Sequence, residues 1–303
     1  MIIGHKFQWQ YLNKAAEAKR VPHAFLFSGE ESIGKRKVAF EFAELILSCK
    51  GESLEKGINP DFHFIKPELK IGKKQISRQI QISQVRELNS FFNLTNFNAP
   101  FKVAIIDDAH FMKQDAQSSF LKLLEEPRGN SVFILISSFP RMILPTIISR
   151  TQVLKFYKVP VLEIKNYLEK ENISKKAVSE LLRFYEGKPG RTMNFVSNPE
   201  ELENQKKMIG EIIKLSKADL ALRFQYVESL VKNSENLNKV LNIWTSYFRE
   251  ILFKKVKKEP CNFENYSLKK IRNLLNLMER LNFLSSSTNI NQRLALEILM
   301  LEL

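Results

Sequence analysis

The sequence predicts an α/β domain with a parallel sheet, followed by two helical domains. Short apolar runs alternate with helical patterns in the first half of the 303-residue chain, and the strand-like runs stop after about residue 160. Strands that are apolar along their whole length are typical of a parallel sheet with both faces covered, because neither face of such a sheet meets water. The second half shows helical periodicity alone.

Four apolar runs are expected to form the strands of the sheet. They are His23–Ser28, Phe62–Ile65, Lys102–Asp107 and Val132–Ser137. Between these runs, apolar residues recur at helical spacing over Val38–Ile46 and Phe120–Leu124. This alternation favours helices that cross over from one parallel strand to the next.

The helical half is expected to contain a small domain and a bundle. Short helices are predicted over Val161–Leu168, Lys175–Tyr185 and Arg191–Phe195. The run Gly187–Gly190 breaks the pattern between the last two. From about residue 200 onward, apolar stripes such as Leu237–Leu252 indicate packed helices. We therefore place the domains at residues 1–160, 161–207 and 208–303.

The composition narrows the class of protein. Apolar residues make up 44% and charged residues 26%, which is typical of a folded globular chain rather than a disordered one. The formal net charge of +14 fits a polyanionic partner such as nucleic acid, and equally a general bias toward lysine.

The location in the cell is predicted from what the sequence lacks. Cys49 and Cys261 lie far apart, which excludes a disulfide framework and fits a reducing compartment. The first ten residues lack the pattern of a secretory signal. No apolar run reaches the roughly 18 residues that span a bilayer. A cytoplasmic protein without membrane contact is expected.

Residues Gly29–Arg36 carry the spacing of a phosphate-binding loop between a predicted strand and a predicted helix. Gly29 and Gly34 precede Lys35 as required, so that backbone N–H groups could cradle phosphates while the lysine reaches the β- and γ-oxygens. The next residue should be Ser or Thr, whose hydroxyl holds Mg²⁺, but it is Arg36. A guanidinium has no acceptor atom. We expect a degenerate nucleotide site without ATP hydrolysis, and passive binding of ATP or ADP stays open.

The second half of such a site should be an apolar strand that ends in an acid. Asp107 falls at the metal-holding position, and Asp108 falls where a catalytic Glu often stands. Asp is one methylene shorter than Glu, so a base at position 108 would lie further from its water. The alternative is an ordinary strand end with two solvated carboxylates.

Six segments, taken in order, carry a wider resemblance. They are His23–Lys35, Val103–His110, Leu121–Pro127, Leu144–Thr151, Gly187–Arg191 and Asn291–Leu303. Together they resemble the delta-prime subunit family of bacterial DNA polymerase III, a clamp-loader branch of the AAA+ proteins. The motifs LLEEP and LPTIISR are the most specific part of the match. The resemblance implies a P-loop AAA+ domain, a helical lid domain and an all-α collar domain.

The resemblance also implies a function. Such a subunit assembles with the ATPase subunits and delta into a hetero-pentamer that loads the sliding clamp onto primed DNA. It generally does not hydrolyse ATP itself, and the chain alone is expected to show neither ATPase nor polymerase activity. The alternatives are an active ATP-hydrolysing motor subunit of the same machine and an independent AAA+ DNA-processing enzyme. The latter would need an intact phosphate loop and a DNA-binding module such as a helix-turn-helix.

Individual roles follow from the matched motifs. The family's Ser-Arg-Cys motif falls on Ser149–Thr151, which implies that Arg150 is an arginine finger acting in trans. A guanidinium supplied in this way accelerates phosphoryl transfer by about 10³–10⁵. Arg191 falls near the second sensor position, where it would either touch nucleotide phosphates or tether the lid. Glu125 and Glu126 are expected to form a solvated helix end rather than an acid/base pair.

One departure from the family concerns zinc. Many relatives carry a four-cysteine zinc module after the first helix of the domain, but the segment Ser48–Asp61 contains Cys49 alone. One thiolate cannot hold a structural zinc ion, so no metal site is expected.

Overall fold

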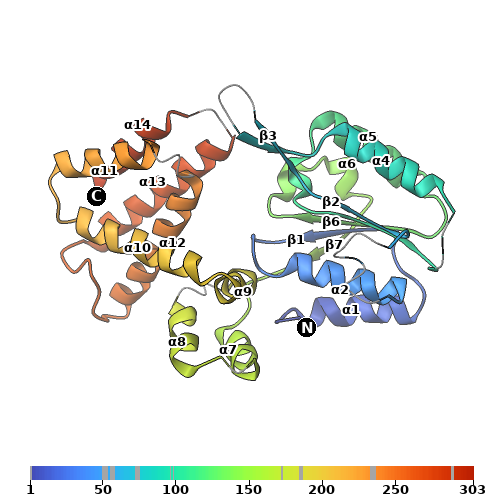
Figure 1. The fold of residues 1–303 in the computed structure, drawn as a ribbon, viewed down its shortest axis with the longest axis horizontal. Coiled ribbons are helices and arrows are strands. Elements are labelled where there is room, and N and C mark those ends of the chain that lie inside the picture. Colours follow the sequence, from blue (N-terminus) through green and yellow to red (C-terminus); the bar gives the residue numbers. More distant parts are fainter. Residues whose placement is uncertain are drawn as a thin grey trace. The chain divides into compact units, whose positions relative to one another are not determined.

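The computed structural model describes residues 2–49, 54, 59–71, 76–95, 97, 99–171, 173–183, 187–232, 237–287 and 290–303. The chain divides into two compact units, Met1–Met193 and Asn194–Leu303. Figure 1 shows the sheet in the first of these units and the long helices in the second. The division into three domains at residues 160 and 207 stays a prediction.

A five-stranded sheet forms the centre of the first unit, and all its neighbouring strands run parallel. Its order is β2 (Phe62–Ile65), β5 (Lys102–Ile106), β6 (Ser131–Ser137), β1 (Ala24–Ser28) and β7 (Gln152–Lys155). Strand β6 therefore separates β1, which leads into the phosphate loop, from β5, which leads into Asp107. The four predicted strands are confirmed, and β7 is an additional edge strand.

Helices cover both faces of this sheet (Figure 1). One face carries α1 (Lys6–Glu17) and α2 (Lys35–Leu47), and the other carries α4 (Ile82–Asn93), α5 (Gln114–Glu125) and α6 (Pro145–Ile148). Side chains alternate between the faces, since Phe25 and Phe27 pack on the α2 side and Leu26 packs on the α5 side. Both faces are dry, which explains why the strands are apolar throughout, and the predicted α/β class is confirmed.

Smaller elements complete the first unit. A separate antiparallel hairpin joins β3 (Glu68–Ile71) to β4 (Ile76–Gln79). The 3₁₀ turns η1 (Ala109–Phe111) and η2 (Pro140–Met142) follow strands β5 and β6. The helices α7 (Val161–Lys170), α8 (Lys175–Arg183) and α9 (Pro189–Ser197) match the predicted short helices. The last residues predicted for the middle helix, 184 and 185, lie outside the described residues.

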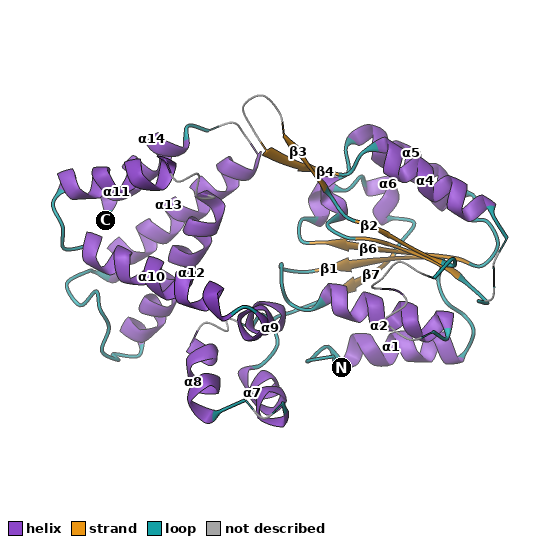
Figure 2. Ribbon diagram, in the orientation of Figure 1, coloured by secondary structure: helices purple, strands orange, loops and turns teal. Residues whose placement is uncertain are grey.

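Every element described in the second unit beyond α9 is a helix, as Figure 2 shows by colour. They are α10 (Pro199–Leu215), α11 (Leu220–Lys232), α12 (Leu237–Val256), α13 (Leu268–Ser287) and α14 (Gln292–Glu302). The predicted stripe on α12 is core, since Trp244 and Phe248 are fully buried. None of the helices described in either unit combines the length and the apolar character that crossing a membrane requires.

Candidate functional site

The phosphate loop lies where β1 ends and α2 begins, and its glycines are required by its geometry. A Cβ atom on Gly29 would lie 2.5 Å from the carbonyl oxygen of Phe156. Gly34 precedes α2 with φ of 103°, in the left-handed region that favours glycine. Both glycines of the motif are therefore explained by the folded backbone, whether or not a phosphate binds.

The side chain of Lys35 folds back onto its own loop. Its Nζ donates to the carbonyl oxygens of Gly29 and Glu30 at 2.6 Å each, and to Oγ of Ser138 at 3.2 Å. Burial lowers the pKa of Lys35 to about 8, against the opposing pull of the Asp108 and Asp107 carboxylates. The ammonium group thus has three protein acceptors, two of them from its own loop.

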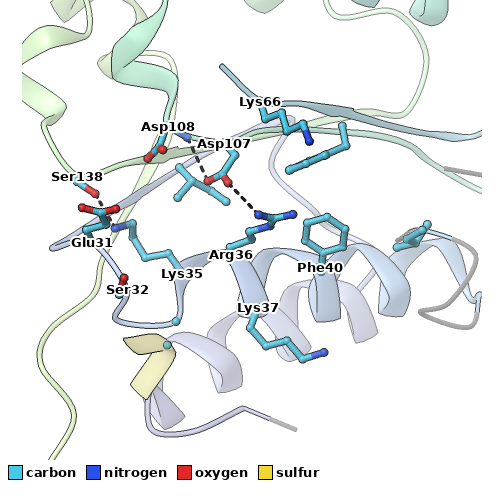
Figure 3. A pocket seen from close by; sticks show the side chains of 15 residues that line it. Glu31, Ser32, Lys35, Arg36, Lys37, Phe40, Lys66, Asp107, Asp108 and Ser138 are labelled. Atoms are coloured by element: carbon cyan, nitrogen blue, oxygen red, sulfur yellow. Dashed lines mark hydrogen bonds and ion pairs between the residues drawn. The ribbon is translucent and has the colours of Figure 1, made fainter. Parts of the chain in front are cut away.

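The side chain of Arg36 points toward the acid at the end of β5, as Figure 3 shows. Its Nη1 lies 3.7 Å from Oδ2 of Asp107. Its guanidinium carbon lies 4.8 Å from the ring centre of Phe64 and 5.6 Å from that of Phe40, which is cation–π distance. The guanidinium of Arg36 thus faces Asp107, the acid that the sequence places at the metal-holding position.

Magnesium does not fit this arrangement. The hydroxyl that would hold the ion is absent, and the guanidinium of Arg36 offers only donors. A second cation beside that guanidinium would also be repelled, and more strongly in this partly buried site than in water.

The two acids after β5 lie together, as the sequence predicts. The Asp107 side chain is 17% exposed, and burial raises its pKa although Arg36 acts in the opposite direction. Burial, together with the negative charges of Asp107 and Glu31, raises the pKa of Asp108 to about 6. Asp108 also has a left-handed backbone with φ of 47°.

These groups line a cavity of about 780 Å³, a size usual for small-ligand sites. Among the described residues, the charged side chains that line it are Lys35, Arg36, Lys37, Lys66, Glu31, Asp107 and Asp108. Lys37 points away from the acids in Figure 3, while Arg36 and Lys35 point toward them. These side chains carry charges of both signs, so the cavity does not present a purely positive surface to an anion.

The segment before α9 and the first residues of that helix pack directly on the phosphate loop. The backbone N–H of Gly190 donates to the carbonyl oxygen of Ser32 at 2.9 Å. Glu30 forms ion pairs with Lys188 at 3.1 Å and with Lys158 at 3.5 Å. Burial alone would raise the pKa of Glu30, but these two lysines bring it below its usual value. The loop is thus held by protein contacts on the side of the predicted lid.

Arg191 lies beside this contact. Its backbone N–H donates to the carbonyl oxygen of Lys188 at 3.1 Å. Among the described residues that line the cavity, its neighbour Gly190 is present and Arg191 is not. Both predicted roles for Arg191 stay predictions.

Arg150 lies just after α6 and is not among the described residues that line the cavity. Its side chain is 41% exposed, and its Nη2 lies 2.9 Å from Oε1 of Glu125. Its Nη1 donates to the carbonyl oxygen of Thr146 at 3.4 Å. Glu125 is the last residue of α5, so the predicted solvated helix end carries an ion pair with the predicted finger.

Three residues of this region make contacts that the sequence did not predict. Ser138 supplies an acceptor to Lys35, Glu30 joins the loop to Lys188, and Glu125 meets Arg150. A signal existed for Ser138, because it follows a predicted parallel strand and such strands end at one edge of the sheet. The two ion pairs join segments far apart in sequence, and no local pattern indicates them.

The prediction of no zinc site concerns a segment that the structure describes only in part. Much of the segment Ser48–Asp61, namely residues 50–53 and 55–58, lies outside the described residues. In the part of the chain that the structure describes, no group of three or more His, Cys, Asp or Glu side chains could hold a metal ion.

Comparison with known proteins points to one family. The family model described as "DNA polymerase III, delta subunit" matches residues 4–160. A protein of Bacillus subtilis named DNA polymerase III subunit delta' is 28% identical over 209 residues, 65% of this chain and 61% of that protein. Its namesake in Pseudomonas aeruginosa is 35% identical over 140 residues, 42% of this chain and 41% of that protein. The chain thus spans less than two thirds of the length of either relative.

A solved structure supports the fold over a longer range. The DNA polymerase III gamma subunit-related protein of Thermotoga maritima has a TM-score of 0.58 and 21% identity, with 96% of this chain and 97% of that chain covered. At this identity the likeness concerns the fold.

Proposed function

Because this chain belongs to the DNA polymerase III, delta subunit, family, we propose that it acts in a clamp loader as the delta-prime type of subunit. The resemblance predicted from the six segments is confirmed by the family match and by the two relatives named delta'. In the proposed role, the chain joins the ATPase subunits and delta in a hetero-pentamer. That assembly acts in the cytoplasm on the sliding clamp and primed DNA.

We further propose that the chain does not hydrolyse ATP, and the pairing of Arg36 with Asp107 carries this proposal. P-loop enzymes hold Mg²⁺ between a loop hydroxyl and an acid that follows another strand of the same sheet, and the ion neutralises charge during phosphoryl transfer. Here the guanidinium of Arg36 lies 3.7 Å from that acid. A nucleotide would also have to compete with the carbonyl oxygens of Gly29 and Glu30 for the ammonium of Lys35.

Arg150 is proposed to act on a nucleotide held by a neighbouring subunit. Its guanidinium is partly exposed and lies outside the chain's own cavity, as a group that acts in trans requires. In a reconstituted loader, Arg150→Ala should lower the ATPase rate that DNA and clamp stimulate. An unchanged rate in a fully assembled loader would refute the role.

The absence of hydrolysis is tested on the pure full-length chain. We expect no Mg²⁺-dependent release of phosphate from ATP above the background of the buffer. The Lys35→Ala variant, purified in the same way, is the matched control for a contaminating ATPase. Turnover by the wild-type chain that this substitution abolishes would contradict the proposal and favour a motor subunit. DNA processing by the pure chain without partner subunits would instead favour an independent enzyme.

A further inference from the structure

We propose that Glu125 is a positioning residue for Arg150, which holds the guanidinium oriented for the nucleotide of a neighbouring subunit. The inference rests on the proposed function, since it takes Arg150 to act in trans. It assigns a specific role to one carboxylate of the LLEEP motif. The other carboxylate of that motif, Glu126, serves as an internal comparison.

Two acceptors on different helices hold the guanidinium of Arg150. Oε1 of Glu125, at the end of α5, lies 2.9 Å from Nη2. The carbonyl oxygen of Thr146, in α6, accepts from Nη1 at 3.4 Å. Because the contacts involve both terminal nitrogens, they restrain the direction of the guanidinium plane as well as its position.

The two acceptors are themselves fixed by packing. Leu124, directly before Glu125, is 2% exposed, and Ile147, directly after Thr146, is fully buried. Both belong to one core cluster between the sheet and its covering helices. Closely packed side chains leave little room for movement, so the ends of α5 and α6 offer a rigid frame for Arg150.

Orientation matters because arginine is long and flexible. Its side chain loses much rotamer freedom when it binds, and a side chain already held in place loses less. The guanidinium has five N–H groups, so its contacts with Glu125 and Thr146 leave donors for phosphate oxygens. With 41% of the side chain exposed, these donors can reach another chain.

The ion pair with Glu125 is too exposed to keep Arg150 from binding a phosphate of a neighbouring subunit. Both partners are more than two fifths exposed, at 41% and 44%. Exposed ion pairs of this kind shift an equilibrium by only about five-fold or less. An arginine finger changes the rate of phosphoryl transfer by about 10³–10⁵, so the charged phosphate remains the stronger partner.

Glu126 provides the matched control within the chain. It has the same charge, follows Glu125 directly and is exposed as the C-cap of α5. Among the ion pairs of the described residues, none involves Glu126. Replacing Glu126 therefore removes the same charge from the same helix end without touching the contact to Arg150.

The test measures the ATPase rate of the full loader at saturating ATP, stimulated by clamp and primed DNA. Wild type is compared with Glu125→Gln, Glu126→Gln, Arg150→Ala and the double variant Glu125→Gln/Arg150→Ala, each checked for assembly by gel filtration. We expect Glu125→Gln to lower the rate about two- to five-fold, as the loss of an exposed ion pair allows. Glu126→Gln should leave the rate unchanged. The double variant should match Arg150→Ala alone, because Glu125 acts only through Arg150.

Each other outcome overturns a defined statement. If Arg150→Ala lowers the rate but Glu125→Gln does not, the positioning role is wrong and the proposed function stands. A rate that rises with Glu125→Gln would mean that the carboxylate competes with the phosphate, and this also overturns the positioning role. A double variant slower than Arg150→Ala would show that Glu125 acts apart from Arg150. No effect of Arg150→Ala in an assembled loader would refute the finger itself, and the inference with it.

Discussion

The guanidinium of Arg36 lies 3.7 Å from the carboxylate of Asp107, at the place where a P-loop enzyme would hold a metal ion. The contact with the rings of Phe64 and Phe40 adds a cation–π attraction that keeps the guanidinium there. Asp107 and Asp108 follow one another, but among the ion pairs of the described residues Arg36 pairs with Asp107 and none involves Asp108. Burial, together with the negative charges of Asp107 and Glu31, raises the pKa of Asp108 to about 6.

We predict that Asp108→Asn stabilises the protein at pH 7.5. The folded chain binds the Asp108 proton more tightly than the unfolded chain does, so stability is lost as pH rises from about 4 through 6. The amide cannot ionise and avoids this loss, which we expect to be worth about 1–3 kcal/mol. Asn also tolerates the left-handed backbone at this position, where φ is 47°. Urea unfolding at pH 4 and pH 7.5 measures the effect.

The comparison between the two pH values decides this prediction. The free energy of unfolding of the variant should exceed that of wild type at pH 7.5, and the difference should nearly vanish at pH 4. Asp107→Asn is the control, because it removes the ion pair with Arg36 and so gives a smaller gain or a loss. An equal difference at both pH values for Asp108→Asn would show that burial of its charge is not the cause.

At the level of single residues, motif spacing indicated the phosphate loop and the two acids, and the family resemblance implied the role of Arg150. It did not indicate what these residues touch. Lys35 bonds to its own loop, and Arg150 bonds to Glu125, which is 25 positions earlier. Such contacts depend on how the ends of separate elements meet, and that information is not in a local pattern.

Among the elements, the strands covered on both faces were predictable, and β3, β4 and β7 were not. Strands β1, β5 and β6 are apolar because both of their faces are covered by helices. The edge strand β7 has two exposed residues, Gln152 and Lys155, and its strand character comes from pairing with β1. The hairpin of β3 and β4 alternates charged and apolar residues only briefly, so its composition resembles a loop.

The start of α9 fits the phosphate loop so closely that it requires glycine. A Cβ atom on Gly190 would lie 2.8 Å from the carbonyl oxygen of Ser32. We predict that Gly190→Ala lowers the free energy of unfolding by about 1–3 kcal/mol, as overpacking against backbone does. Urea unfolding followed by circular dichroism measures the change.

Gly210 supplies the opposite case for comparison. It lies inside α10, and a Cβ atom there would meet nothing within 4 Å. Gly210→Ala should therefore stabilise the protein by about 0.5–1 kcal/mol, since Ala restricts the unfolded chain and favours helix. If Gly190→Ala were as well tolerated as Gly210→Ala, the close fit of α9 on the loop would be disproved.

On the scale of the whole molecule, each unit has a core of its own, and the second unit leaves apolar residues uncovered. Leu294, Ile298 and Leu301 of α14 are 55%, 40% and 59% exposed. Their spacing of four and three residues places them along one face of the helix. In the proposed collar domain this face would contact another subunit, because exposed apolar stripes mark contacts between proteins.

We predict that the double variant Leu294→Lys/Leu301→Lys loses assembly with the partner subunits. Both side chains are exposed in the chain alone, so the charges should weaken association while leaving the fold intact. Gel filtration of the mixed subunits, with circular dichroism of the pure chain, measures both properties. Glu302→Lys, which changes an exposed polar residue of the same helix, is the control. Full assembly of the double variant would place the partner surface elsewhere.

The most direct measurement compares two substitutions in this chain within one reconstituted loader. The ATPase rate stimulated by DNA and clamp is recorded with Lys35→Ala and with Arg150→Ala, after gel filtration has confirmed complete assembly of both. We expect Lys35→Ala to leave the rate unchanged and Arg150→Ala to lower it, because in the proposed function the chain's own phosphate loop does no hydrolysis and its arginine acts on a neighbour. A rate that falls with Lys35→Ala and stays constant with Arg150→Ala would show the reverse, a working ATPase site and no arginine finger.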